Sequence, residues 1–437
     1  MSLRDTLIIA IVLLGALAAL RRPWIGVLLW TWLSIMNPHR FAWGVAYDAP
    51  LAAIAAVSTL LGALITRDKA SPFKGAPVVL FTLFTIWLTL SWLMGIDPDN
   101  DYWQWNKVIK INFMILVGLA LLHPKQHIFA LTWVAAGSLA LLGFKGGLFT
   151  VLTGGNFRVW GPSGSFIEDN NEFALAVVMA IPMLRFLQLQ LVSRWGKHAL
   201  TLTMVLCAAS ALGSHSRGGL LAITAMTAVL WWRGRSRVLG GIVIVTCALS
   251  LLAFMPESWS ARMSTIESSD YDASVIGRFS AWWTAWGVAK NYPFGAGFEV
   301  ARPELVAMYS PYPTSVHAAH SIYFQVLGNH GFVGLFLFIL IGATTWSSTR
   351  WLRRHTLGIP QARWAHDLAS MAQVSMVGYA VGGAFLSLSY FDLPYIIMSL
   401  VVLTRVWVHS RAWEREPPVR PRWWAVPGLA MSTAKSG

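Results

Sequence analysis

Residues 76–95, APVVLFTLFTIWLTLSWLMG, decide the kind of fold that this chain forms. The run holds no charged residue, and most of its side chains are aliphatic or aromatic. A helix rises 1.5 Å per residue, so about 20 residues cross the roughly 30 Å hydrocarbon core of a bilayer. We therefore interpret this run as a membrane span.

The composition of the whole chain supports the same interpretation. Of the 437 residues, 56% are hydrophobic and only 12% are charged, whereas about 25% are charged in an ordinary globular protein. So few charges cannot cover the surface of a soluble fold of this length. The sequence therefore predicts an all-α polytopic integral membrane protein.

Apolar runs that resemble residues 76–95 recur along the chain. We expect 12 or 13 transmembrane helices, because the first two runs are short and form a shallow hairpin in the alternative interpretation. The thirteen runs are 6–20, 23–36, 50–66, 76–95, 107–122, 127–143, 171–189, 198–213, 218–232, 238–254, 320–346, 368–388 and 393–408.

The distribution of charge predicts how these helices are oriented. One set of loops, together with the C-terminal tail, holds 22 of the 33 basic residues and four of the 19 acidic ones. Since Lys and Arg concentrate on the cytoplasmic side of membrane proteins, this set faces the cytoplasm. The net charge of +14 is then a sign of topology, and it does not indicate nucleic acid as a partner.

This orientation divides the chain into four regions. We expect transmembrane helices with short outer loops over 1–254, one large periplasmic loop with amphipathic helices over 255–319, C-terminal transmembrane helices over 320–408, and a basic cytoplasmic tail over 409–437.

Two arginines on the outer side are candidates for binding an anion. Arg217 lies in GSHSRGG (213–219), where Ser214 or Ser216 can cap the next helix and the helix amides can add to an anion site. Arg278 lies in 276–291, whose aromatic residues recur at helical spacing, as in a helix on the membrane surface. The alternatives are an arginine that snorkels to the interface at 217 and a lipid anchor at 278.

A pair of histidines stands where the large loop meets the span from 320. His317 and His320 are three residues apart in TSVHAAHS (314–321), which puts both on one face if this segment is helical. With an ordinary pKa of about 6.5, an imidazole at this boundary suits a general base. His317, nearer to water, is expected to help orient the substrate, and a merely exposed side chain is the alternative there. A structural role is the alternative for the pair, and a metal site is weakly indicated because no third ligand is evident.

Other outer residues are candidates of lower rank. Lys145, Arg158 and Arg302 are expected to contact phosphates or sugars, and Asp169 or Asn170 can cap the next span. The acidic turn DPDND (97–101) has the spacing of a divalent metal site, although a solvated loop is the favoured interpretation.

The residues from His320 onward form a longer pattern. His320-Ser321, nine residues, and then Gly331-Phe-Val-Gly334 resembles the signature of the bacterial O-antigen ligases, in the O-antigen ligase/polymerase superfamily. The order of parts is also similar, with a Ser-Arg-Gly turn, a long outer loop with an Arg-led helix, and then the His motif. The N-terminal part, including RRPWIGVLLWTW (21–32), resembles ligases associated with exosortase systems, whose acceptors are less clear.

The resemblance implies a fold, a reaction and a site. The family resembles inverting, metal-independent glycosyltransferases of the GT-C kind, so no metal or other cofactor is expected. Such a ligase transfers O-antigen from undecaprenyl pyrophosphate to a sugar hydroxyl of lipid A–core, at the periplasmic face of the bacterial inner membrane. These two substrates and membrane lipids are the expected partners. The functional residues of the family correspond to His320, Arg217 and Arg278 here.

Two other activities belong to the same superfamily and stay open. One is O-antigen polymerisation, and the other is protein O-glycosylation by an oligosaccharyltransferase. A transporter of polyprenyl-linked glycans is less favoured, because transporters carry ionisable residues within their spans. The spans here hold almost none.

Overall fold

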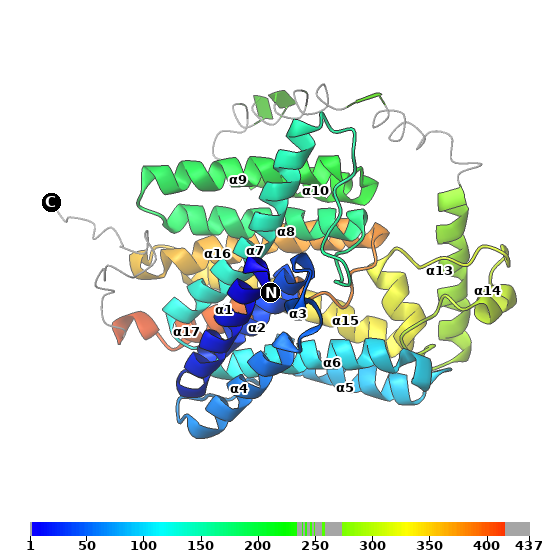
Figure 1. Ribbon diagram of the computed structural model, residues 1–437, viewed down its shortest axis with the longest axis horizontal. Coiled ribbons are helices and arrows are strands. Elements are labelled where there is room, and N and C mark those ends of the chain that lie inside the picture. The colour runs from blue at the N-terminus through cyan, green and yellow to red at the C-terminus, as the bar shows by residue number, and fades with distance from the viewer. Residues whose placement is uncertain are drawn as a thin grey trace.

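The computed structural model describes residues 2–233, residues 273–415 and a few isolated positions between 238 and 257. Within these residues the chain forms only α-helices and short 3₁₀-helices (Figure 1). The expected span 238–254, the first part of the expected large loop and most of the expected tail lie outside the described residues.

Seven of the described helices are long and apolar enough to cross a membrane, as expected of a polytopic membrane protein. They are α1 (Leu3–Arg21), α5 (Ala76–Leu93), α7 (Lys125–Leu152), α8 (Asn170–Gln190), α15 (Ile322–His355), α16 (Arg363–Gly382, with the 3₁₀ turns η3 Pro360–Ala362 and η4 Gly383–Phe385) and α17 (Asp392–His409).

Five further helices coincide with the other expected spans that fall in the described residues. They are α2 (Pro23–Met36), α4 (Leu51–Ile65), α6 (Pro98–Leu121), α9 (Arg194–Gly213) and α10 (Arg217–Arg233). The remaining elements are α3 (Val45–Asp48), α13 (Ala273–Asn291), α14 (Pro303–Tyr309) and the 3₁₀ turns η1 (Pro38–Phe41) and η5 (Ala412–Glu414). The number of 12 or 13 transmembrane helices stays a prediction.

Two helices extend further into the expected loops than the apolar runs indicated. α6 begins at Pro98, because Asp97 caps it by accepting a hydrogen bond from the Asn100 N–H, and proline suits the first helical position. α7 continues to Leu152, so the expected loop 144–170 begins only after it. Hydropathy alone gives the length of the apolar segment, whereas capping decides where the helix itself starts.

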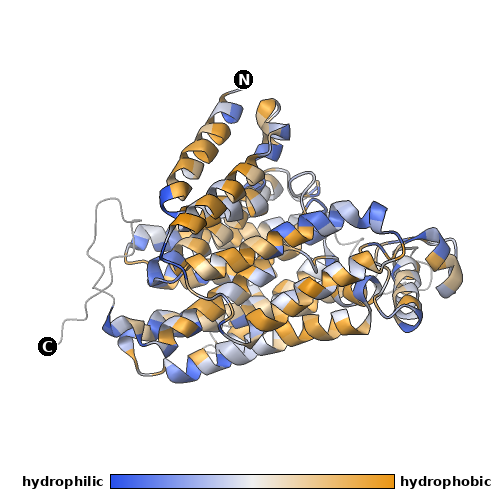
Figure 2. Ribbon diagram, turned by 90° about the horizontal axis from the view of Figure 1, so that it is seen from below, coloured by the Kyte–Doolittle hydropathy of each residue, from blue (hydrophilic) through white to orange (hydrophobic). Residues whose placement is uncertain are grey.

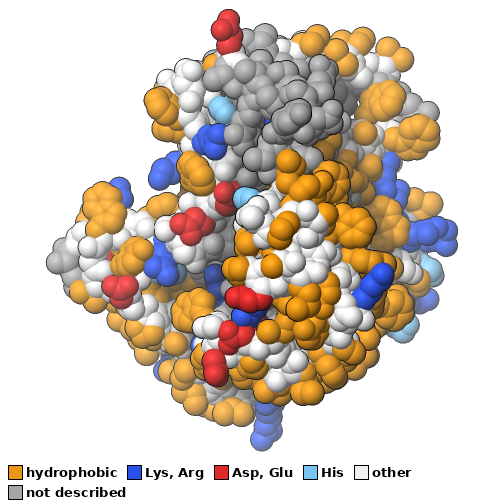
Figure 3. Space-filling model, turned by 90° about the vertical axis from the view of Figure 1, so that its right-hand side faces the viewer, with side chains coloured by type: hydrophobic (Ala, Val, Ile, Leu, Met, Phe, Trp, Pro, Cys, Tyr) orange, Lys and Arg blue, Asp and Glu red, His pale blue; other side chains and the backbone are white. Residues whose placement is uncertain are grey.

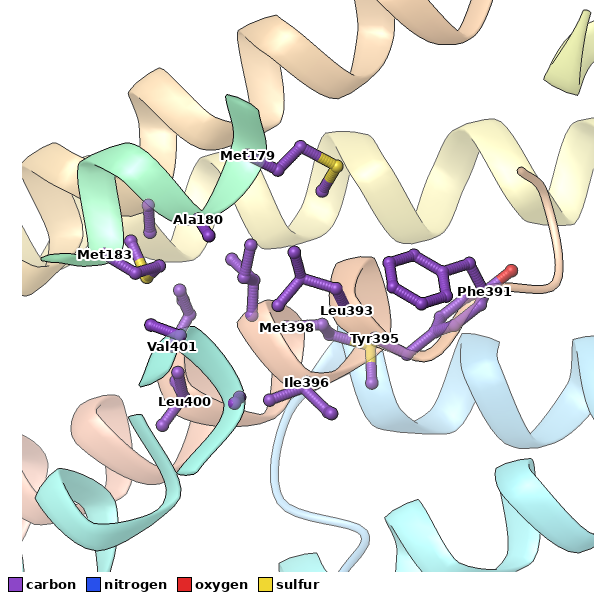
Figure 4. Close-up of a cluster of buried hydrophobic side chains, with 14 of the residues drawn as sticks. Met179, Ala180, Met183, Phe391, Leu393, Tyr395, Ile396, Met398, Leu400 and Val401 are labelled. Carbon is purple, nitrogen blue, oxygen red and sulfur yellow. The ribbon is translucent and has the colours of Figure 1, made fainter. Parts of the chain in front are cut away.

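The centre of the bundle is α8. It packs against α7, α9, α10 and α16, and nearly all of its side chains are buried. Figure 4 shows Met179, Ala180 and Met183 of α8 directed toward apolar side chains of α17, such as Leu393 and Met398. A helix that is apolar all round belongs inside such a bundle, and Figure 2 shows apolar residues along the outer helices as well.

At one end of the bundle α13 runs across the direction of the long helices (Figure 1). Its aromatic side chains Phe279, Trp283 and Trp286 are exposed, while Trp282 donates a hydrogen bond to the carbonyl of Ala319 at 2.8 Å. An exposed aromatic stripe on a crosswise helix is typical of an interfacial helix. The helix that the sequence predicted over 276–291 is present as α13.

A buried polar group, which we call the His330 joint, holds this end of the bundle together. The fully buried imidazole of His330 lies 2.7 Å from Ser91 Oγ of α5 and 2.6 Å from the hydroxyl of Tyr390. Asn329 donates from Nδ2 to the carbonyl of Phe298 at 2.8 Å. The joint therefore ties α5, the turn at 292–299, α15 and the start of α17 to one another.

The helix that carries the joint is broken directly after it. Gly331 has φ 67° and ψ −172°, which is not helical, and a Cβ there would lie 2.5 Å from the carbonyl oxygen of Pro293. Gly331 is therefore packed closely against a neighbouring segment, but it interrupts the helix, which is not continuous from His320 to Gly334. Only glycine fits both this conformation and the close backbone approach.

The break predicts a difference between two glycines of α15. Gly331→Ala should lower the free energy of unfolding by roughly 1–3 kcal/mol through backbone strain and the clash with Pro293. Gly342→Ala is the matched control, because no atom lies within 4 Å of a Cβ at that position and alanine favours a helix. Thermal unfolding in detergent micelles measures both, and equal midpoints would contradict the role of the break.

Candidate functional site

His320 lies in the segment that connects α14 to α15. Its φ of 41° is left-handed, and the residues 315–320 are not helical, since α15 begins at Ile322 with Ser321 as N-cap. The expectation that His317 and His320 share one helical face is therefore wrong. A left-handed histidine is uncommon and strained, and such strain is frequent at functional sites.

Three ionisable side chains shift the pKa of His320. Burial lowers the pKa of its imidazole, the charge of Arg278 lowers it further, and the nearby Asp169 carboxylate opposes both effects. His317 also acts on it and packs beside Gly277, next to Arg278 in the chain. Since its pKa lies below the ordinary 6.5, His320 is mainly neutral at pH 7 and can accept a proton.

Two carboxyl groups stand at the start of α8. Asp169 caps the helix, with the Asn171 N–H donating to its Oδ1 at 2.8 Å, as the sequence predicted. Burial raises the pKa of Asp169, but hydrogen bonds from Glu172 and Asn171 outweigh this and lower it. Glu172 is 6% exposed, and its Oε1 accepts a hydrogen bond from the Ser387 N–H at 3.2 Å.

Arg217 is the first residue of α10, beside the same end of α8. Ser216 accepts a hydrogen bond from the Gly219 N–H at 3.1 Å, so it caps α10 as one of the two expected serines. Asn170 donates from Nδ2 to the carbonyl of Ser214 at 2.6 Å. The turn that carries Arg217 is thus fixed to the residue that follows Asp169.

A cleft of about 570 Å³ opens beside His320, within the roughly 300–1,000 Å³ of typical ligand sites. Figure 3 looks onto this end of the molecule, where acidic and basic side chains interrupt the apolar surface. The cleft is lined by Gln104 and Lys107 of α6, by Trp160, Ser165, Phe166, Glu168 and Asp169 of the loop after α7, by Glu172, and by Ala318, His320 and Ser387.

The candidates of lower rank lie elsewhere. The guanidinium of Arg302 pairs with Asp97 at 3.1 Å and with Asp101 at 2.8 Å. Lys145 belongs to α7, not to a loop, and its Nζ lies 5.0 Å from the centre of the Phe41 ring. Arg158 is exposed on the loop after α7. None of the three lines the cleft beside His320, so their proposed contacts with substrate stay predictions.

The acidic turn at 97–101 has a structural role. Asp97 caps α6, and the buried Asp101 accepts the Phe298 N–H at 2.7 Å in addition to pairing with Arg302. These carboxylates therefore hold the segment 297–302 against α6. In the part of the chain that the structure describes, no three His, Cys, Asp or Glu side chains are grouped to hold a metal ion.

Sequence reasoning missed the rest of the cleft. Gln104 and Lys107 fell at the edge of an expected span, and Trp160 is one of 24 tryptophans. Glu172 falls inside the expected span 171–189. Nothing in the sequence indicates that these residues meet His320, because they lie about 150 to 215 positions away from it.

A comparison with known protein families matches the part of the chain that holds three of the candidate site residues. Residues 202–339, which contain Arg217, Arg278 and His320, match a family described as O-antigen ligase. The chain therefore carries an O-antigen ligase domain over these residues, which confirms the resemblance to the O-antigen ligase/polymerase superfamily. Residues 3–190 match a family described as a family of unknown function (DUF5935). A search of curated proteins finds no match to this chain.

The surroundings of His320 predict how its protonation responds to a neighbour. Its apparent pKa should lie below 6.5, and Asp169→Asn should lower it further, because the carboxylate stabilises the imidazolium while asparagine keeps the helix cap. The rate of reaction with diethyl pyrocarbonate against pH, followed at His320 by mass spectrometry, measures this. Asp99→Asn, at an exposed position, is the control, and a higher pKa in Asp169→Asn would contradict the arrangement.

Proposed function

We propose that this protein transfers O-antigen from undecaprenyl pyrophosphate to a sugar hydroxyl of lipid A–core at the periplasmic face of the inner membrane. The reaction is a single displacement that inverts the anomeric centre and uses no metal. The hydroxyl oxygen attacks the anomeric carbon, the bond to the pyrophosphate oxygen breaks, and undecaprenyl pyrophosphate leaves. The proton of the hydroxyl passes to a base on the protein.

The observation that supports this reaction most is the position of His320. A half-buried imidazole with a lowered pKa interacts electrostatically with Arg278 and with the carboxylate of Asp169, at a cleft large enough for a ligand. A neutral imidazole accepts the proton of the hydroxyl as the new bond forms. Asp169 then stabilises the imidazolium that results.

The two arginines supply the positive charge that a pyrophosphate leaving group needs. Negative charge grows on the bridging oxygen as the bond breaks, and preorganised donors at that position lower the barrier. The planar guanidinium binds phosphate oxygens with two hydrogen bonds and stays charged at any working pH. Arg278 acts directly on His320, and Arg217 lies at a helix N-terminus, where amides favour anions.

The location at the end of an apolar bundle suits substrates that stay anchored in a membrane. The exposed aromatic residues of α13 place Arg278 on a helix that fits the membrane surface. A pyrophosphate on a polyprenyl chain lies at the same depth as such a helix. The donor therefore reaches the arginines without leaving the bilayer.

Reconstitution with defined substrates tests this proposal. The purified protein in liposomes is incubated with an undecaprenyl-pyrophosphate glycan and with lipid A–core, a serine-containing peptide, or further donor as acceptor, each with and without EDTA. Transfer to lipid A–core that survives EDTA is expected. Transfer only to peptide or only to a second donor glycan would contradict the ligase assignment, and restoration by magnesium after EDTA would contradict the metal-free step.

Substitutions at the site should distinguish the loss of rate caused by removing the base from the loss caused by removing its neighbours. His320→Ala should slow transfer roughly 10²–10⁴-fold, the range of general-base catalysis, and His317→Ala should cost less because that side chain is exposed. Arg217→Ala and Arg278→Ala should nearly abolish transfer, and Arg278→Lys should rescue poorly because a point charge lacks the bidentate fork. Initial rates in the liposome assay measure all five variants. A near-normal rate in His320→Ala would overturn the assignment of the base.

A further inference from the structure

The cleft beside His320 is built by both family matches, not by the O-antigen ligase domain alone. His320 belongs to the matched residues 202–339. The side chains of α6, of the loop after α7 and of the start of α8 belong to the matched residues 3–190, which have no assigned function. Any ligand in the cleft therefore contacts both parts of the chain.

The loop after α7 is held firmly in place. Both carboxylate oxygens of Glu168 accept hydrogen bonds from within the loop, from Ser163 Oγ at 3.0 Å and from the Gly164 N–H at 2.8 Å. Lys107 of α6 donates to the carbonyl of Gly164 at 3.4 Å, and its Nζ lies 3.9 Å from the centre of the Phe166 ring. Lys107 and Glu168 are thus positioning residues that fix the loop against α6.

The same loop holds Trp160 at the cleft with its ring uncovered. The Val159 N–H donates to the carbonyl of Gly213 at 3.1 Å, and the Gly161 N–H donates to the carbonyl of Glu168 at 3.0 Å. The residues on both sides of Trp160 are therefore bonded, while its side chain is 55% exposed and lines the cleft. A rigid, exposed tryptophan provides a large flat contact surface at low entropic cost.

The charges of the cleft select against an anionic ligand. Among the described residues that line it, Glu168 and Asp169 are carboxylates, and Lys107 is the only Lys or Arg. Arg278 acts on His320 but does not line the cleft, and neither does Arg217. A pyrophosphate is favoured on the side of the arginines, whereas carboxylates accept hydrogen bonds from neutral hydroxyl groups.

We propose that the cleft binds the neutral sugar that carries the acceptor hydroxyl, with Trp160 stacking on the sugar ring and Asp169 and Glu172 accepting hydrogen bonds from its hydroxyls. This inference rests on the proposed transfer reaction. It assigns the donor pyrophosphate and the acceptor sugar to different sides of His320. It also gives the N-terminal family match a role, because that part of the chain supplies every acceptor contact except His320.

Kinetics with each substrate varied in turn test this assignment. In the liposome assay with an undecaprenyl-pyrophosphate glycan and lipid A–core, Trp160→Ala should raise the KM for the acceptor roughly tenfold. The KM for the donor should stay within twofold, and Trp160→Phe should keep most of the acceptor affinity. Trp103→Ala is the matched control, because Trp103 is 72% exposed on α6 and does not line the cleft.

The outcomes separate this inference from the proposed function. An unchanged acceptor KM in Trp160→Ala, or an equal rise in the donor KM, would overturn the acceptor subsite while the wild-type protein still transfers. An equal effect of Trp103→Ala would show a general loss of membrane placement and would also overturn it. Failure of the wild-type protein to transfer to any acceptor would overturn the proposed function, and the inference with it.

Discussion

The His330 joint is the interaction on which the site end of this bundle depends. An imidazole buried in an apolar interior is costly unless it is hydrogen-bonded, and here its partners are Ser91 of α5 and Tyr390, two residues before α17. The same joint holds the turn at 292–299, through Ser91 and Asn329, against the break in α15. The connection from that turn to His320 therefore starts from a fixed point.

The sequence predicted the helices well and the site only in part. Uncharged runs predict where helices lie, since a bilayer core tolerates few charges, and α2 coincides with the run 23–36. The candidates His320 and Arg278 interact in the structure, and Asp169 joins them. The arrangement of His317, the break at Gly331 and the pairing of Arg302 were not predictable, because each depends on contacts between distant segments.

The residues that line the cleft also could not be predicted from the sequence, because they come from distant segments. Trp160 and Lys107 carry no signal in one sequence, yet both line the cleft with His320, where hydrogen bonds join the loop after α7 to Lys107 of α6 and to Gly213. Under the proposed reaction, the O-antigen ligase domain provides the base and the cations for the donor, and the N-terminal helices provide the surface for the acceptor. Differences in acceptor among related chains would then arise in the N-terminal part.

In the proposed reaction, His320 separates a donor side from an acceptor side. A cryo-electron microscopy map of the protein in nanodiscs with undecaprenyl pyrophosphate bound would show which side the pyrophosphate occupies. Pyrophosphate density is expected against Arg217 and Arg278, with the cleft at Trp160 free of it. Pyrophosphate density inside the cleft, beside Lys107, Asp169 and Glu172, would contradict this division of the site.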